Sequence, residues 1–244
     1  MKKLFGTIVR WLGATKKLAV FRKYAKRILI YYYYRKNMVL VFYDSNKPNG
    51  KTFKLIQQIK KETEMLLDDL EAYQIYTAVI KTEKIAGDIA EVGVYKGGSA
   101  KLICEARGGK PVHLFDTFEG LPDLCELDSS KQFHKGDYSA LFESVKDYLK
   151  NYPNVYFYKG LFPSTAEPVE NKKFSFVHLD VDLYESTLNC LKFFYPRMNR
   201  GGAIISHDYP SSEGVKKAFD EFFSDKPELV IDLLSYEQCL ILKA

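Results

Sequence analysis

Three aspartates follow two apolar, strand-like segments in the C-terminal half of the sequence. Asp180 and Asp182 end the segment 174–182, and Asp208 comes directly after 203–207. In open α/β sheets, ligands bind at the carboxyl ends of the strands. If these strands are neighbours, the three carboxylates converge and repel one another unless a cation or a proton offsets their charge. A hard ion that prefers oxygen ligands, such as Mg²⁺, suits this cluster; three separate solvated acids are the alternative.

A histidine stands beside the last of these acids. His207 precedes Asp208, and it could be a metal ligand, a general base or a structural side chain. His178 lies inside the earlier strand and is interpreted as structural. His134 lies in a loop that could form part of a lid over a cofactor.

A glycine-rich turn follows an earlier apolar segment. Residues 90–99 read AEVGVYKGGS and run from a predicted strand into a predicted helix. Glycines there allow a tight turn and a close approach to a ligand, and free N–H groups at a helix start favour a polar or negative group. The spacing differs from the G-x-G-x-x-G of dinucleotide sites, which counts against NAD. A turn that binds nothing is the alternative.

An acid two residues before the first glycine is the arrangement of S-adenosylmethionine-dependent methyltransferases. Here that acid is Glu91, and its carboxylate could face the cationic methionine end of the cofactor. The cofactor-binding residues predicted in this turn are Glu91, Gly93, Tyr95, Lys96, Gly97, Gly98 and Ser99.

A second acid ends the next apolar segment. Asp116 closes the segment 111–116, 23 residues after Gly93. An acid at this point can accept hydrogen bonds from both ribose hydroxyls of a nucleoside. Thr117 and Phe118 follow and could contact the adenine, Phe118 by stacking. A solvated aspartate at a strand end is the alternative.

Strand-like and helical segments alternate from residue 85 onward, which predicts a mainly parallel sheet covered on both faces. We expect strands at 88–94, 111–116, 155–159, 174–182, 203–207, 229–234 and 238–242, and helices at 99–107, 139–151, 185–198 and 213–224. Only residues 235–237 join the last two strands, so these should pair antiparallel. This predicts an α/β, Rossmann-like class I methyltransferase fold with seven strands and a C-terminal antiparallel hairpin.

The N-terminal part differs in composition from the rest of the chain. Eleven of the 36 Lys and Arg residues lie in 1–43, which has no Asp or Glu, and 25 basic residues face 31 acidic ones in the remainder. We expect a basic arm over 1–50 with an amphipathic helix at 4–29, a helical lid or linker over 51–84, helical at 52–83, and the methyltransferase domain over 85–244. Residues 1–30 could contact an anionic membrane, or they could pack on the body or on a partner subunit.

Composition restricts the remaining classes. The chain has 244 residues, of which 46% are hydrophobic and 27% charged, which is ordinary for a globular protein. Its four cysteines form no C-x-x-C pair, so we expect neither a zinc site nor a disulfide scaffold, and a reducing cytoplasm is the simplest location. No apolar run reaches the ~18 residues of a membrane span, and basic residues interrupt any signal-peptide core. We expect no nucleic-acid partner, because the acidic crevice would repel a phosphate backbone.

Several motifs in order resemble one enzyme family. They are 88–99, LFDTFEGLP at 114–122, KGLF at 159–162, HLDVDLYEST at 178–187, and Gly201-Gly202 followed by His207-Asp208-Tyr209. Together they resemble the macrocin O-methyltransferase family (TylF/MycF type) over residues 85–244. The resemblance implies S-adenosylmethionine, Mg²⁺, methylation of a sugar hydroxyl, and a dimer or larger oligomer.

The resemblance also implies roles for individual residues. Asp180 and Asp208 match metal ligands, and Asp182 matches a general base or a further metal contact. His207 stands where some members have a second adjacent aspartate, so it is a candidate ligand or base. By the same likeness Gly160, Phe162 and Asp180 would contact the cofactor.

The implied mechanism is metal-assisted deprotonation followed by in-line methyl transfer. The acceptor could instead be a catechol-type small molecule. A protein of another class, a non-catalytic scaffold docked to a membrane glycan-assembly complex, would share the fold but fail to bind the cofactor. The glycine spacing disfavours a dehydrogenase.

Overall fold

The computed structural model describes residues 48–129, 131–209, 211–233 and 237–244. The chain divides into two compact units, residues 1–50 and 51–244. The predicted helix at 4–29 and the proposed membrane-contacting residues 1–30 lie outside the described residues. No helix in the described part of the chain is both long and apolar enough to span a bilayer.

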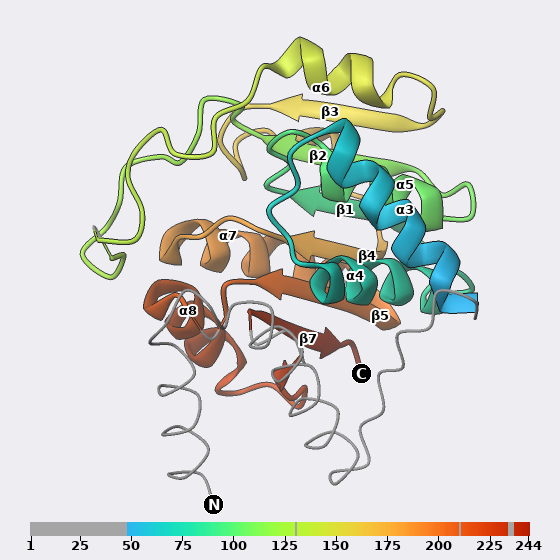
Figure 1. Cartoon of the computed structure of the whole chain (residues 1–244). Helices are drawn as coiled ribbons and strands as arrows, with labels where there is room; N and C mark the ends of the chain where they lie inside the picture. Colours follow the sequence, from blue (N-terminus) through green and yellow to red (C-terminus); the bar gives the residue numbers. More distant parts are fainter. Residues whose placement is uncertain (1–47, 130, 210, 234–236) are drawn as a thin grey trace, which may run out of the picture. The chain divides into compact units, whose positions relative to one another are not determined.

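Seven strands form one sheet. They are β1 (Asp88–Val92), β2 (Val112–Asp116), β3 (Val155–Lys159), β4 (Phe174–Leu179), β5 (Met198–His207), β6 (Ile231–Asp232) and β7 (Gln238–Leu242). Their spatial order is β3-β2-β1-β4-β5-β7-β6 (Figure 1). β1 to β5 pair in parallel, whereas β7 is antiparallel to both β5 and β6. The predicted fold class and its terminal antiparallel pair are confirmed.

Five strands differ in length from the prediction, namely β1, β2, β4, β5 and β6, and the changes in β4 and β5 bear on the site. β4 ends at Leu179, so Asp180 and Asp182 lie in the loop that follows, and Asp182 has a φ of 61° that no strand permits. β5 begins at Met198 rather than 203, because the preceding helix ends earlier than predicted. Pro196 is the second residue of a short 3₁₀ turn, η3 (Tyr195–Arg197), and the strand follows this turn directly.

Six α-helices and a second 3₁₀ turn are described beside the sheet. They are α3 (Pro48–Glu62), α4 (Asp69–Lys81), α5 (Gly98–Ala106), α6 (Phe142–Leu149), α7 (Tyr184–Phe194), α8 (Glu213–Phe223) and η2 (Glu167–Val169). The turn η2 lies in the link from β3 to β4, for which the sequence predicted no regular helix.

The single helix predicted over 52–83 is wrong: two helices, α3 and α4, are separated by the loop 63–68. The break has a local cause. Asp68 caps α4 by accepting from the N–H groups of Leu70 and Glu71 at 2.7 and 2.8 Å, while the Glu71 carboxylate accepts from the N–H of Asp68 at 2.6 Å. This reciprocal capping box satisfies the first N–H groups of a new helix start, which a continuous helix would not expose.

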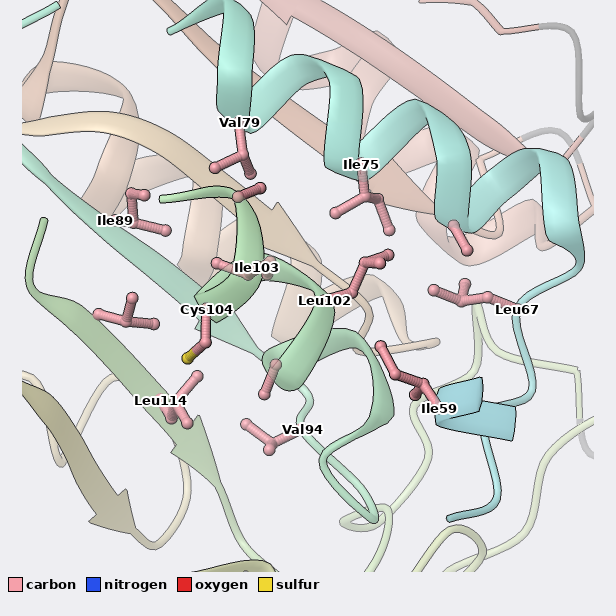
Figure 2. Packing of buried hydrophobic residues seen from close by; sticks show 14 of the residues in the cluster. Ile59, Leu67, Ile75, Val79, Ile89, Val94, Leu102, Ile103, Cys104 and Leu114 are labelled. Carbon is pink, nitrogen blue, oxygen red and sulfur yellow. The ribbon is translucent and has the colours of Figure 1, made fainter. Parts of the chain in front are cut away.

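The alternation of side chains along the strands divides the core between the two faces of the sheet. On one face, Ile89 and Leu114 pack with apolar residues of α3, α4 and α5. Figure 2 shows Ile59 and Ile75 converging on Leu102 in this cluster. On the other face, Ala90 and Phe115 pack with apolar residues of α7 and α8. The helices α3 and α4 therefore share the first of these two hydrophobic clusters with the sheet.

Candidate active site

A cavity lies at the carboxyl ends of β1, β2, β4 and β5, the edge at which open α/β sheets bind ligands. Twelve of the sixteen predicted site residues line it: Gly93, Tyr95, Gly98, Ser99, Asp116, Thr117, Gly160, Phe162, Asp180, Asp182, His207 and Asp208. Four residues are not in the lining: Glu91, Lys96, Gly97 and Phe118. The topology thus joins the glycine turn, the strand-end acid and the acid cluster in one cavity.

The glycine turn is shaped by backbone contacts. Gly93 has a φ of 88°, and a Cβ there would lie 1.8 Å from the carbonyl oxygen of Asp180. Gly97 is the N-cap of α5 with a left-handed φ of 79°, and it has no side chain to cap the helix. Among the described residues, no side chain caps the first N–H groups of α5, at Gly98 and Ser99 in the cavity wall, so these groups can bind a polar ligand group.

Asp116 fastens this turn to the end of β2. Its Oδ2 accepts hydrogen bonds from the N–H groups of Val94 and Tyr95 at 2.7 and 2.8 Å, and its Oδ1 accepts from that of Phe118 at 2.6 Å. These bonds fix the carboxylate at the cavity wall. The two oxygens offer about four acceptor sites, and three are used, so one site on Oδ1 remains for a hydroxyl group.

Glu91 does not reach the cavity, and its predicted contact with the cofactor's methionine end finds no support in the geometry. It points to the same face of the sheet as Ile89, and its Oε1 lies 2.8 Å from Nδ1 of His178. Both side chains are fully buried. Burial raises the pKa of Glu91 although His178 opposes the shift. The pair lies within the core, and His178 has the structural role that the sequence suggested.

The other three predicted cofactor residues outside the cavity lining are held elsewhere. Phe118 is buried and its ring packs against Phe142 at a centroid distance of 4.9 Å, so it is not available to stack on an adenine. Lys96 Nζ lies 2.5 Å from Glu64 Oε2 in the loop that precedes α4. Gly97 faces Val145 of α6.

The acid cluster forms beside the glycine turn because β4 and β5 are neighbours. One ligand atom from each of Asp180, His207 and Asp208 lies within 4.8 Å of the others. His207 Nδ1 lies 2.9 Å from Asp208 Oδ2 and 3.5 Å from Asp180 Oδ1. On the other side of the ring, Nε2 lies 3.6 Å from Oε2 of Glu71, a residue that also forms the capping box of α4.

Burial and mutual repulsion set the charges in this cluster. Burial alone lowers the pKa of His207, but the surrounding carboxylates, led by Asp180, raise it to about 12. Burial, together with the carboxylates of Asp180 and Asp208, raises the pKa of Asp182 well above its ordinary value, and burial also raises that of Asp180. For Asp208, burial acts in the same direction, but the hydrogen bond with His207 holds its pKa below the ordinary value. Burial and mutual repulsion therefore both disfavour ionisation of the Asp180 and Asp182 carboxyl groups.

This donor set fits a divalent cation. Two carboxylates and an imidazole within one ion's reach are oxygen and nitrogen ligands, and a bound cation would offset the repulsion that raises the pKa values of Asp180 and Asp182. The predicted ligands Asp180, His207 and Asp208 are therefore brought together, and Asp182 lies beside them in the lining.

Other cavity residues were not named individually as site residues, although they lie in the two segments that the sequence suggested as lids, 51–84 and the loop around His134. Glu64, Met65, Leu66 and Leu67 come from the loop between α3 and α4, and Tyr138 comes from the loop between β2 and α6. The D-x-x-E pattern of Asp68 and Glu71 carried a usable signal, because it marks a helix start and hence a loop before it. Tyr138 ends the segment 133–138, which contains His134 and which the sequence suggested as part of a lid over the cofactor.

Comparison with known proteins identifies the family to which the chain belongs. The profile of the macrocin O-methyltransferase (TylF) family matches residues 62–234, which is more than half of the chain. The chain belongs to this family. The resemblance seen in the sequence motifs is therefore confirmed, and the matched residues include both the glycine turn and the acid cluster.

Two relatives and one solved structure illustrate the similarity. A Streptomyces olivaceus 8-demethyl-8-(2,3-dimethoxy-alpha-L-rhamnosyl)-tetracenomycin-C 4'-O-methyltransferase is 28% identical over 158 residues, 59% of this chain and 60% of the relative. A demethyldecarbamoylnovobiocin O-methyltransferase from Streptomyces niveus is 31% identical over 154 residues, 57% of this chain and 58% of the relative. The match thus spans about 60% of the relatives' length. The solved structure of the O-methyltransferase NovP shares the fold with a TM-score of 0.69, at 22% identity over 82% of this chain and all of that one.

Proposed function

We propose that this protein is an S-adenosylmethionine- and Mg²⁺-dependent O-methyltransferase that acts on a sugar hydroxyl of a glycan or a glycosylated metabolite. One observation carries the proposal. The cluster of Asp180, His207 and Asp208 opens into the same cavity as the glycine turn and Asp116. A methyl donor and a metal-bound acceptor would therefore meet inside one cavity.

The acceptor class rests on the relatives. Their names describe one enzyme that methylates the 4'-position of a substituted rhamnosyl group and one that methylates demethyldecarbamoylnovobiocin. We extend the sugar class to this chain because it shares their family. A catechol-type acceptor stays the alternative with the same cofactor, and a non-catalytic scaffold is the alternative from another class.

Particular residues would hold S-adenosylmethionine. Asp116, fixed at the cavity wall, can accept a hydrogen bond from one ribose hydroxyl on Oδ1, and Thr117 and Phe162 line the wall beside it. The free N–H groups at Gly98 and Ser99 suit the carboxylate of the methionine end. Because a Cβ at Gly93 would collide with neighbouring backbone, the turn needs glycine there in order to form.

The chain's own residues would handle the acceptor proton. Asp180, His207 and Asp208 would hold Mg²⁺, which when bound lowers the pKa of a coordinated hydroxyl group. Asp182 can take the proton, because burial and its acidic neighbours raise its pKa toward the range of an effective general base. His207 is a weaker candidate, because the carboxylates raise its pKa to about 12 and the ring must lose that proton before it can accept another or bind a cation. S-adenosylmethionine, when bound, would supply the methyl group by direct displacement, in which sulfur would keep the electron pair of the broken carbon–sulfur bond, so no covalent enzyme intermediate would be needed.

Three further proposals come from the sequence. We propose that the protein is cytoplasmic and that it forms a homo-oligomer. We also propose that residues 1–30 can bind the inner, anionic face of the cell membrane. Deleting residues 1–30 should weaken binding to phosphatidylglycerol vesicles while leaving cofactor binding unchanged. Equal vesicle binding by both proteins would remove the membrane proposal.

The deciding experiment has two stages. Calorimetric titration with S-adenosylmethionine and S-adenosylhomocysteine, with and without Mg²⁺, should give micromolar binding. Mass spectrometry should then detect methylation within a panel of p-nitrophenyl glycosides of rhamnose, fucose, glucose, galactose, mannose and glucuronic acid, with TDP-rhamnose and catechol. Methylation of catechol alone would favour the catechol alternative. A folded protein that binds neither cofactor form would favour the scaffold.

A further inference from the structure

Tyr138 occupies an unusual position in the cavity wall. Its ring meets that of Tyr95 edge-on, with centroids 6.2 Å apart and an interplanar angle of 86°. Both residues line the cavity, and Tyr138 keeps 40% of its surface exposed. Tyr95 belongs to the glycine turn, so the pair joins the cofactor side of the cavity to the loop between β2 and α6.

The backbone of Tyr138 is strained, and contacts on both sides hold it in place. Its φ is 62°, which bulky residues rarely adopt. On the N-terminal side, the carbonyl of Asp137 accepts a hydrogen bond from the N–H of Leu121 at 2.9 Å. On the C-terminal side, the N–H of Ala140 donates a hydrogen bond to the carbonyl of Phe118 at 3.3 Å. Strain of this kind persists only where the surroundings enforce it, and it concentrates at ligand-binding positions.

The hydroxyl of Tyr138 is available to a ligand. Within the part of the chain that the structure describes, no hydrogen bond holds it. Its surroundings are acidic: burial and the carboxylates of Asp182, Asp208, Asp137 and Asp180 raise the pKa of Tyr138. The phenol therefore stays protonated and offers a hydrogen-bond donor beside the carboxylates that would activate the acceptor.

We infer that Tyr138 is a specificity-determining residue for the acceptor, and that its hydroxyl donates a hydrogen bond to a sugar oxygen next to the one that is methylated. The inference rests on the proposed function. The ring contact with Tyr95 sets the position of the phenol relative to the glycine turn, and the acid cluster lines the same cavity as Tyr138. Tyr138 would therefore fix the orientation of the sugar between the methyl donor and the acids.

The test compares two single-atom deletions. Tyr138→Phe removes the hydroxyl and keeps the ring, and Tyr156→Phe is the matched control, since Tyr156 is 46% exposed on β3 and lies outside the cavity lining. The measurements are kcat and KM for the panel glycoside that the wild type methylates fastest, and the Kd for S-adenosylhomocysteine. We expect Tyr138→Phe to raise the acceptor KM by about 3- to 10-fold, the effect of one lost hydrogen bond, and to leave the Kd unchanged.

Each other outcome contradicts the inference in a distinguishable way. An unchanged acceptor KM in Tyr138→Phe, with an active wild type, overturns the role of Tyr138 alone. A parallel loss of S-adenosylhomocysteine affinity, or a loss of folded protein by circular dichroism, would assign the hydroxyl to the cofactor site or to the loop instead. A wild type that methylates no sugar in the panel removes the proposed function, and this inference with it.

Discussion

Gly93 lies so close to Asp180 that a Cβ on the glycine would stand 1.8 Å from the carbonyl oxygen of the aspartate. The N–H of Asp180 also donates to the carbonyl of Val92 at 2.9 Å. The first glycine of the cofactor turn and the first acid of the cluster are therefore packed backbone against backbone. The distance between the proposed cofactor and metal sites is set by this contact rather than by flexible side chains.

Replacing this glycine should damage both sites at once. Gly93→Ala puts a methyl group into the backbone of Asp180, so we expect a loss of stability of several kcal/mol, with loss of S-adenosylhomocysteine binding. Gly109→Ala is the matched control, because Gly109 has almost the same φ, 89°, and nothing within 4 Å of an added Cβ. The control should cost only about 1 kcal/mol, from backbone strain alone. Urea unfolding of both variants measures the loss in free energy of unfolding. An equal loss in the two variants would contradict the close approach of Gly93 to Asp180.

Asp180→Asn tests the acid cluster. The amide is nearly isosteric but removes one charge from the proposed metal site, so turnover should fall at least about 100-fold, and added Mg²⁺ should no longer change the rate. Binding of S-adenosylhomocysteine should remain measurable by calorimetry. Asp147→Asn on α6 is the control, since Asp147 is exposed and pairs only with Lys150 among the described residues. Full activity of Asp180→Asn, or equal wild-type activity in excess chelator, would refute the metal role.

The break between α3 and α4 depends on one cap. Asp68→Ala removes the acceptor for the N–H groups of Leu70 and Glu71, so the free energy of unfolding should fall by about 1 kcal/mol. Asp68→Ser keeps a capping oxygen and should recover most of that loss. Chemical denaturation measures both variants. Equal stability of Asp68→Ala and the wild type would mean that packing alone sets the start of α4.

The buried carboxylate of Glu228 should control stability in acid. Burial opposes its ionisation, but hydrogen bonds from Lys243 at 2.6 Å and Tyr195 at 2.6 Å lower its pKa from 4.5 to about 2. A lowered pKa stabilises the fold above pH 4.5, and this stabilisation is lost as the pH falls from 4.5 toward 2. The free energy of unfolding of Glu228→Gln should therefore decline less steeply than that of the wild type over this range. Glu143→Gln, on the exposed side of α6, is the control and should follow the wild type.

The number of strands, their mainly parallel pairing and the acids at their ends were readable from the sequence alone. The apolar segments before Asp116, Asp180 and Asp208 predicted parallel strands, and the three-residue link at 235–237 predicted an antiparallel end. Both inferences use short-range information: residue type, period and connection length. The grouping of Asp180 with Asp208 followed from one further assumption, that their strands are neighbours, and the sheet order confirms it.

Side-chain direction and long-range approach depended on the tertiary structure. Glu91 and Phe118 have the residue types of ligand-binding groups, yet the pleat of β1 turns one toward His178 and a left-handed turn after β2 buries the other against Phe142. Tyr138 and the loop before α4 reach the cavity from segments far from the motifs in sequence. Motif spacing specifies which strand ends carry acids, but packing between distant segments decides which side chains share a cavity.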